Sequence, residues 1–383
     1  MKRILFIGTS RGPGGTESHL ITLACAMADA GYQVSAVACE GDVIYEALAD
    51  HGGITLRAAC FEKTRDWRAI AAVYRACREL EPDEVVGSFR REFWPIAIVA
   101  RCLGIPVTLF VHTRRMRRVT AWLLPALVRR LIFPSADLRE WAVKRGVSRR
   151  RTALLYNPID VKRLSAAREM RCHARETLGF QPRDVVIGFM GRFEDQKGIH
   201  PLAEILDRVM DSCPNARALW VGSGADGNVL RARLAASRHA DRHLIRQWTA
   251  SPETYYAAMD VLAFPSLRNE TFGRVSAEAQ ACGVPVAASR VGGIPETLID
   301  GETGVLLGAA DVAAWIRALE QIVNDESLRA RMGRLGSSFV SREFAAPHIA
   351  EQFAQLLALP ARPATRRQRR SAVPDPRAAS ANV

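Results

Sequence analysis

Short apolar runs alternate with helix-type segments along most of the chain, and this alternation constrains the fold most. Residues 3–8 are typical of a buried strand, a glycine-rich turn and a helical pattern follow to about Ala30, and residues 33–39 form the next apolar run. Strand, loop, helix and strand in this order predict a βαβ unit with parallel strands. Further strands are expected at residues 54–59, 84–88, 106–112 and 152–156.

A second series of strands starts near Asp184, after the charged, helix-prone segment 161–182. Its runs lie at residues 184–190, 216–221, 243–246, 261–264 and 284–287. A chain of 383 residues suits two domains with separate cores. We predict an α/β protein with two facing, Rossmann-like, doubly wound domains and a cleft between them. The expected parts are a first domain (1–160), a linker (161–182), a second domain (183–345) and a disordered basic tail (361–383).

The net charge of +13 is concentrated in the first half. Residues 1–157 hold 24 Lys+Arg against 15 Asp+Glu, whereas residues 158–360 hold 23 against 24. A basic half would attract an anionic membrane surface or a phosphorylated acceptor. Biased composition is the alternative, since 48 of the 53 basic residues are Arg. No nucleic-acid-binding module is recognisable, so nucleic acid is not an expected partner.

The eight cysteines are scattered singly, and none belongs to a Cys-x-x-Cys pair. This pattern predicts reduced, packed thiols in a cytoplasmic protein rather than a disulfide framework or a zinc site. The chain shows no signal peptide, and no apolar run reaches the roughly 20 residues of a membrane span.

The stretch from residue 260 to residue 304 carries the clearest chemical pattern. A strand-type run ends at Pro265, Glu270 lies in the following loop, and Glu278 lies eight residues later in a helix. Phe272-Gly273 stands at the start of that helix, where free N–H groups suit a phosphate or a sugar oxygen. A carboxylate can accept bonds from two neighbouring hydroxyls. The stretch therefore predicts a site for a ligand with phosphates and vicinal diols, as in a nucleotide sugar.

This stretch closely resembles the donor-binding region of the retaining glycosyltransferases of family 4, which have the GT-B fold. The family pattern is Glu, seven residues, Glu, and here it is flanked by Ala-Cys-Gly-Val-Pro-Val and Gly-Gly-Ile-Pro-Glu. The resemblance covers residues 1–358 and is strongest from 185 to 306. It implies that helix 346–358 crosses back to the first domain. It also implies a substrate-binding segment that includes Thr271, Phe272 and Gly273.

Arg192 and Lys197 lie on either side of one turn after the strand 184–190. Both can reach a diphosphate, Arg by its planar fork and Lys as a point charge. They match the diphosphate-binding pair of the family. The loop that begins at Gly222 is another place where a backbone can approach a ligand closely. Trp248 lies where the family holds the nucleobase, and it either stacks on the base or packs beneath it.

The loop after the first strand contains Gly14, Gly15 and Glu17. It does not have the Gly-x-Gly-x-x-Gly spacing of a dinucleotide site. It matches the Gly-Gly-x-Glu opening of the family, which faces the donor phosphates and the acceptor. His112 ends the strand 106–112, at the edge of a parallel sheet where ligands bind. Family members often carry a His here, close to the donor sugar.

Four arginines between residues 114 and 118 precede an apolar stretch that contains Trp122. Such a segment suits an anionic bilayer, or else a core helix with a solvated basic edge. The linker exit, Asn157-Pro158, departs from the Asn-Gly usual in the family.

The resemblance implies a hexosyltransferase-type enzyme. From the basic first domain with its Arg114–Arg118 cluster we expect a role in lipopolysaccharide, exopolysaccharide or other cell-surface glycan synthesis. The enzyme would move a sugar from a nucleotide donor to a glycan or lipid-linked acceptor with retention. Arg192 and Lys197 would neutralise the leaving diphosphate, Glu278 would hold the ribose, and Glu270 and His112 would orient the sugar. The resemblance also implies that no cofactor or metal is required, and the absence of any Asp-x-Asp agrees with metal independence. The expected location is cytoplasmic, with peripheral contact to the inner face of the membrane.

Three other functions remain open at this point. A sugar-nucleotide 2-epimerase shares the fold and needs no acceptor. An NAD-dependent dehydrogenase explains the loop at residues 8–17 but not the second half of the chain. A non-catalytic sensor would bind the donor without transferring the sugar.

Overall fold

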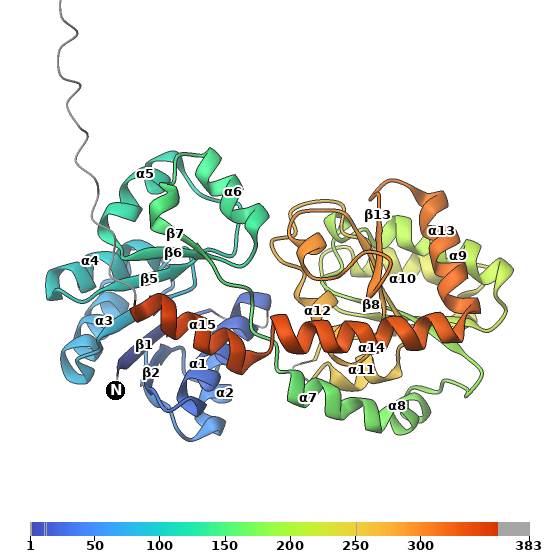
Figure 1. Cartoon of the computed structure of the whole chain (residues 1–383), viewed down its shortest axis with the longest axis horizontal. Helices are drawn as coiled ribbons and strands as arrows, with labels where there is room; N and C mark the ends of the chain where they lie inside the picture. Colours follow the sequence, from blue (N-terminus) through green and yellow to red (C-terminus); the bar gives the residue numbers. More distant parts are fainter. Residues whose placement is uncertain (1, 11, 13, 250, 359–383) are drawn as a thin grey trace, which may run out of the picture.

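The computed structural model describes residues 2–10, 12, 14–249 and 251–358, and these form two α/β domains (Figure 1). The expected tail at 361–383 lies outside the described residues. Each domain has one parallel sheet with helices on both faces, so the predicted fold class of two doubly wound domains is confirmed.

The first domain has a seven-stranded sheet in the order β3-β2-β1-β4-β5-β6-β7. Its strands are β1 (Arg3–Gly8), β2 (Gln33–Ala38), β3 (Thr55–Ala58), β4 (Glu84–Gly87), β5 (Val107–Phe110), β6 (Arg130–Phe133) and β7 (Thr152–Leu154). Its helices are α1 (Gly15–Asp29), α2 (Val43–His51), α3 (Trp67–Leu80), α4 (Phe93–Leu103), α5 (Arg118–Leu127) and α6 (Ala136–Lys144).

The second domain has a six-stranded sheet in the order β10-β9-β8-β11-β12-β13. Its strands are β8 (Val185–Met190), β9 (Ala216–Val221), β10 (His243–Arg246), β11 (Val261–Phe264), β12 (Val286–Ser289) and β13 (Gly304–Leu307). Its helices are α9 (Ile199–Ser212), α10 (Gly227–Ala235), α11 (Glu253–Ala258), α12 (Arg274–Ala281), α13 (Val312–Asn324) and α14 (Glu326–Glu343).

In both sheets the strand order reverses beside the first strand, β1 or β8. Chain connections leave opposite faces of the sheet at such a point, so a crevice opens at the carboxyl ends of the strands. All residues of β8 are buried, which agrees with a strand covered by helices on both faces. No strand was predicted at β13, which begins with a glycine directly after the turn residues 301–303.

The segment expected as a linker forms two helices, α7 (Val161–Ala166) and α8 (Arg171–Leu178). Both pack on the second domain, α8 against α11 and α7 against α12. Near the crossing, Ile159 N–H donates to Phe344 O at 2.8 Å, and Ala346 N–H donates to Ile159 O at 2.9 Å. The two chain crossings between the domains are therefore hydrogen-bonded to each other.

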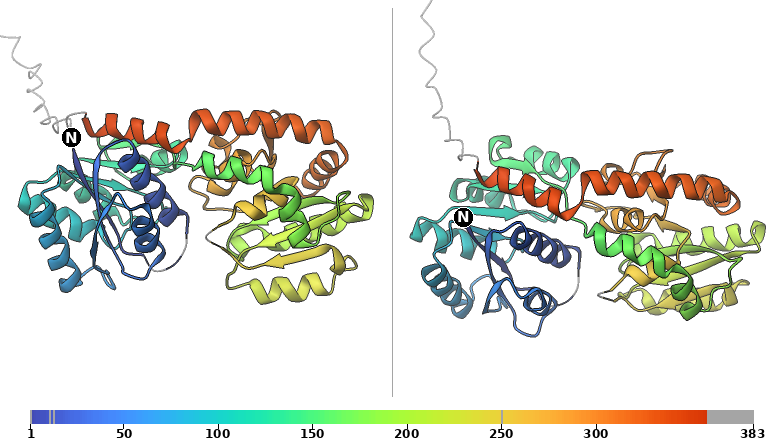
Figure 2. Two further views of the ribbon diagram at one scale, coloured as in Figure 1. Left: turned by 90° about the horizontal axis from the view of Figure 1, so that it is seen from below. Right: turned by 60° about the horizontal axis from the view of Figure 1, so that its bottom comes forward.

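Helix α14 runs along the second domain, and α15 (Ala346–Ala358) continues onto the first (Figure 2). Phe353 of α15 lies in the first-domain core, with its ring centroid 5.4 Å from that of Phe110. Lys2 Nζ and Arg129 Nη1 donate to Leu357 O at 2.8 and 2.7 Å. Cations at a helix C-terminus satisfy free carbonyls and favour the helix dipole, so they anchor α15 to the first domain.

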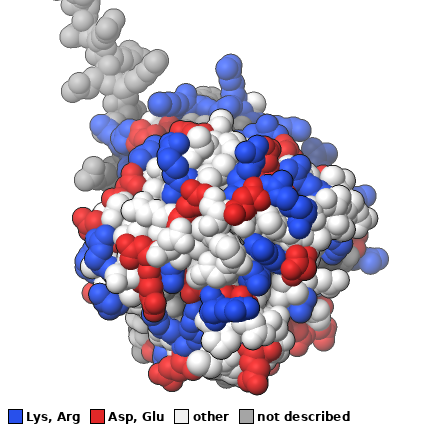
Figure 3. Space-filling view, turned by 90° about the vertical axis from the view of Figure 1, so that its right-hand side faces the viewer, with Lys and Arg blue, Asp and Glu red and all other residues white. Residues whose placement is uncertain are grey.

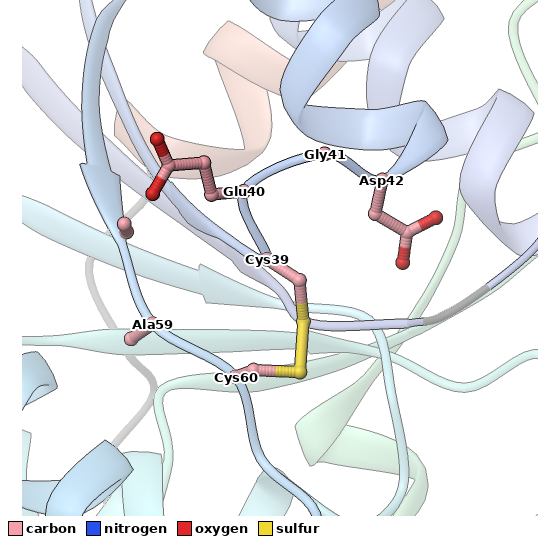
Figure 4. A pocket seen from close by; sticks show the side chains of 7 residues that line it. Cys39, Glu40, Gly41, Asp42, Ala59 and Cys60 are labelled. Carbon is pink, nitrogen blue, oxygen red and sulfur yellow. A yellow bond between two sulfur atoms is a disulfide. The ribbon is translucent and has the colours of Figure 1, made fainter.

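Cys39 and Cys60 form a disulfide with a Cα–Cα distance of 4.8 Å (Figure 4). The prediction that all cysteines are reduced is wrong for this pair. The cause is strand register: Ala38 of β2 pairs with Ala58 of β3, so the residues just past both strand ends are neighbours. The other six cysteines are free.

Charged side chains of both signs cover the second-domain end of the molecule. Figure 3 looks onto the second-domain end of the molecule, where basic and acidic side chains are interspersed rather than gathered by sign. No helix within the described residues has both the length and the apolar character needed to cross a membrane.

Candidate active site

A cleft of about 1950 Å³ lies between the two domains. Loops at the carboxyl ends of both sheets line it, together with the starts of α1 and α12. Eleven of the thirteen predicted site residues line the cleft. They are Gly14, Gly15, His112, Arg192, Lys197, Trp248, Glu270, Thr271, Phe272, Gly273 and Glu278.

Lys197 and Glu270 form the central ion pair of the second-domain side. Lys197 Nζ lies 2.5 Å from Glu270 Oε2, and the two side chains are 19% and 14% exposed. Lys197 is held by the turn that ends at Gly198, whose φ is +73°. A Cβ at Gly198 would lie 2.1 Å from Pro265 O, so this turn needs glycine. The chain thus brings Lys197 against a loop more than 70 residues later.

Arg192 follows β8 and is 65% exposed, with Nη1 2.7 Å from Glu194 Oε1. An exposed pair of this kind is weak and can exchange partners at little cost. Arg192 is therefore able to leave Glu194 for a phosphate. Gly222 does not line the cleft. Its Cβ would lie 1.9 Å from Gly191 O, so it lets the β8 and β9 loops pack together.

Glu278 is bound on both oxygens. Arg274 Nε lies 2.6 Å from Oε1, and Tyr256 Oη donates to Oε2 at 2.9 Å. Arg274 also reaches the first domain: Nη1 donates to Pro158 O at 2.9 Å and Nη2 to Thr22 Oγ1 at 3.4 Å. Arg274 is not among the site residues predicted from the sequence. Its position four residues before Glu278 on a helix was the available signal.

His112 lies at the end of β5, with Nε2 buried and without a hydrogen-bond partner among the described residues. Desolvation by burial and the nearby Arg274 charge lower the pKa of His112 to about 3. Its imidazole is therefore neutral at pH 7 and can donate or accept one bond to a ligand hydroxyl. His19 of α1 lies against it, with ring centroids 4.6 Å apart.

The glycine-rich loop brings Gly14 and Gly15 to the cleft at the N-terminus of α1. Free N–H groups of a helix start favour an anion or a sugar oxygen. Glu17 does not line the cleft, because its carboxylate turns back to accept from Ser10 Oγ. Of the three residues predicted from the Gly-Gly-x-Glu opening, Gly14 and Gly15 therefore line the cleft and Glu17 does not.

The loop before α12 also joins the domains. Ser135 Oγ donates to Thr271 O at 2.6 Å. Glu296 of the second domain accepts from Ala136 N–H at 2.7 Å and Asp137 N–H at 3.0 Å, at the N-terminus of α6. Phe272 is buried beneath this loop, whereas Trp248 is 37% exposed at the cleft. Stacking of a nucleobase on Trp248 stays a prediction.

Two family models match the chain. Residues 171–338 match "Glycosyl transferases group 1" and residues 13–163 match "Glycosyltransferase Family 4". Together the two models span most of both domains. The chain belongs to the family 4, group 1 glycosyltransferases.

Solved structures share the architecture of this family member. HepE from Anabaena aligns with a TM-score of 0.81 at 22% identity, over 93% of this chain and 99% of HepE. A glycosyltransferase from Rickettsia africae aligns with a TM-score of 0.82 at 15% identity, over 93% and 97%. At these identities the likeness shows the fold, which is GT-B.

Curated relatives match this chain over part of their length. A D-inositol 3-phosphate glycosyltransferase from Corynebacterium jeikeium is 36% identical over 178 residues, 44% of this chain and 42% of the relative. The capsular polysaccharide biosynthesis glycosyltransferase CapM from Staphylococcus aureus is 35% identical over 169 residues, 44% of each chain. The chain therefore matches somewhat less than half the length of these relatives.

Proposed function

We propose that this protein is a glycosyltransferase that moves a sugar from a nucleotide-sugar donor to an acceptor with retention of configuration. The Lys197–Glu270 pair carries the proposal. It lies in a cleft between two domains, beside Arg192 and the start of α12. A cation beside a carboxylate suits a ligand with both a diphosphate and sugar hydroxyls. HepE, which shares the fold, was crystallised with UDP and glucose, and that supports the same donor class here.

The roles follow from chemistry. Arg192 and Lys197 neutralise the diphosphate as negative charge develops on it during departure. Glu270 accepts from sugar hydroxyls while Lys197 holds it, and neutral His112 binds another hydroxyl. Glu278 holds the ribose with its remaining lone pairs.

Retention by double displacement requires a carboxylate that can attack the anomeric carbon. Two second-domain carboxylates that line the cleft, Glu270 and Glu278, are each bound to a cation in a largely buried ion pair, which lowers their nucleophilicity. This supports a front-face route in which the leaving phosphate helps to deprotonate the acceptor. The proposal includes metal independence, supported by the absence of Asp-x-Asp from the sequence.

Thermal unfolding against a panel of nucleoside diphosphates and their sugars tests the donor site. A ligand above its Kd raises the Tm by mass action. We expect one nucleotide sugar to stabilise the wild type and the control Lys144→Ala, but neither Lys197→Ala nor Glu278→Ala. Stabilisation by NAD or NADP alone would instead favour the dehydrogenase. An epimerised nucleotide sugar formed without an acceptor would favour the 2-epimerase.

The proposal places the acceptor at the inner face of the cell membrane, in lipopolysaccharide or other surface-glycan synthesis. Helix α5 supports peripheral binding there, because Val119 and Trp122 are 63% and 74% exposed beside Arg117 and Arg118. Basic and aromatic residues together suit an anionic bilayer surface. The relatives from Corynebacterium and Staphylococcus support a cell-surface or phosphorylated acceptor class by their names.

Co-sedimentation with vesicles containing phosphatidylglycerol at low salt tests membrane binding. We expect Trp122→Ser to lower the bound fraction. Trp67→Ser is the matched control, since Trp67 is 76% exposed on α3. Failure of the wild type to sediment with the vesicles removes this part of the proposal.

A further inference from the structure

Arg90 and Arg115 stand on the first-domain side of the cleft. Arg90 follows β4 and Arg115 follows β5, and these strands are neighbours in the sheet, with Gly87 paired to Leu109. Both arginines are exposed and line the cleft. The sheet thus presents two guanidinium groups from adjacent loops at one edge.

Neither side chain makes a hydrogen bond or ion pair within the described part of the chain. Their neighbours in sequence are occupied: Arg91 Nη2 donates to Thr9 O, and Arg114 Nη2 pairs with Asp137. Like charges in a concave site repel each other and raise the local potential for an anion. The positive charges of Arg90 and Arg115 are therefore not paired with any carboxylate of the described residues.

The backbones of the loops that carry Arg90 and Arg115 are held by hydrogen bonds. After Arg90, buried Glu92 accepts from Thr9 N–H at 2.8 Å, so the β4 loop is tied to the β1 loop. Arg115 N–H donates to Thr113 Oγ1 at 3.2 Å in a local turn. Ordered backbones lower the entropy cost of binding, since only the ends of the side chains need to be ordered.

We propose that Arg90 and Arg115 bind a phosphate group of the acceptor. A phosphomonoester carries about two negative charges at neutral pH, which matches two guanidinium groups. The planar fork of Arg favours bidentate bonds to phosphate. This site is separate from Arg192 and Lys197, which lie on second-domain loops and take the donor diphosphate. The inference rests on the proposed transferase function, because it assigns the ligand to the acceptor.

Titration with inorganic phosphate at constant ionic strength tests the site, with calorimetry and Tm as readouts. Arg192→Ala/Lys197→Ala serves as the background, so that the donor cations do not bind the probe. We expect phosphate affinity to fall about ten-fold or more when Arg90→Ala/Arg115→Ala is added, since each charge-assisted bond contributes strongly. Arg68→Ala/Arg78→Ala on the outer face of α3 is the control with the same charge change. It should leave the affinity unchanged.

Equal phosphate affinity with and without Arg90 and Arg115, or an equal loss in the control, overturns the site. Binding of UDP, GDP and ADP to Arg90→Ala/Arg115→Ala with an intact donor site is measured in parallel. Absence of any nucleotide binding counts against the proposed function, whereas the phosphate titration reads out the acceptor site independently.

Vesicles containing phosphatidic acid distinguish the source of the phosphate. Vesicle binding that also falls in Arg90→Ala/Arg115→Ala identifies a lipid-borne phosphate. Vesicle binding that stays at the wild-type level, with phosphate affinity lost, identifies a soluble phosphorylated acceptor.

Discussion

The two sides of the cleft differ in whether their cationic side chains form ion pairs with carboxylates. On the second-domain side two cations are paired with carboxylates, Lys197 with Glu270 and Arg274 with Glu278. On the first-domain side His112 is neutral, and Arg90 and Arg115 have no side-chain partner among the described residues.

The difference has a physical consequence. The ion pairs hold the second-domain side chains in place without a ligand. A donor that carries phosphates and hydroxyls can then bind to the cations and the carboxylates of these pairs. An unpaired side has a field that attracts a charged molecule from a distance. We therefore propose that the second-domain side positions the donor and that the first-domain side attracts the charged acceptor.

The largest expected effect on activity comes from removing the Lys197–Glu270 ion pair of the second-domain side. Lys197→Ala removes the charge next to the leaving diphosphate and leaves Glu270 without its cation. We expect the rate of sugar transfer to fall about 100- to 1,000-fold, as for loss of a preorganised electrostatic contact. Initial rates with the donor from the nucleotide panel measure this. Lys144→Ala on α6 is the control, and a Lys197→Ala rate close to wild type would contradict the assignment.

The second prediction concerns the disulfide of the first domain. The Cys39–Cys60 disulfide joins residues 21 apart in the chain. Cys60→Ser should lower the free energy of unfolding by about 3 kcal/mol, because a closed loop of this size restricts the unfolded chain. Chemical denaturation measures the change, with the exposed free cysteine Cys102 replaced by Ser as the control. Dithiothreitol should destabilise the wild type but not Cys60→Ser, and equal behaviour of the two would sink the prediction.

Arg274 of the second domain also bonds to the first-domain side of the cleft, so its removal tests how much this link contributes to stability. Arg274→Ala leaves Glu278, which is 13% exposed, without a cation and breaks the bond to Pro158 O. We expect a loss of about 2 kcal/mol in unfolding free energy. Arg290→Ala removes an exposed ion pair with Asp300 and should cost less than about 1 kcal/mol. Equal losses in the two variants would show that the link contributes no more than a surface pair.

The smallest predicted effect is a pH dependence at the first-domain side. Burial raises the pKa of Glu92 to about 7 in the folded protein. The folded state therefore holds this proton more tightly than the unfolded state. The stability that Glu92 contributes is fully present below its unfolded pKa and is lost as the pH rises through about 7.

Between pH 5 and pH 6 the contribution of Glu92 to the unfolding free energy of the wild type should fall by about 1 kcal/mol. Glu92→Gln cannot ionise, so its unfolding free energy should vary less over the same range. Denaturant titrations at the two pH values provide the measurement. Parallel changes in wild type and variant would show that Glu92 does not titrate as expected.

Local patterns were enough for the fold and for much of the site. Buried runs such as Val185–Met190 and the glycine turns predict two doubly wound domains, because strand burial and turn geometry act over short distances. The spacing of Glu270 and Glu278 places both near one helix start. The same reasoning placed Arg192 and Lys197 at the cleft, although their roles stay predictions.

Tertiary structure alone decided which distant groups meet. The register of β2 against β3 brings Cys39 to Cys60, and the packing of the domains brings Arg274 to Pro158 O, 116 residues away in the chain. It also turns Glu17 from the cleft, and it leaves the side chains of Arg90 and Arg115 without a hydrogen-bond or ion-pair partner among the described residues. A sequence shows which groups can form a bond, whereas the fold decides which of them come within reach, because a bond requires contact at about 3 Å.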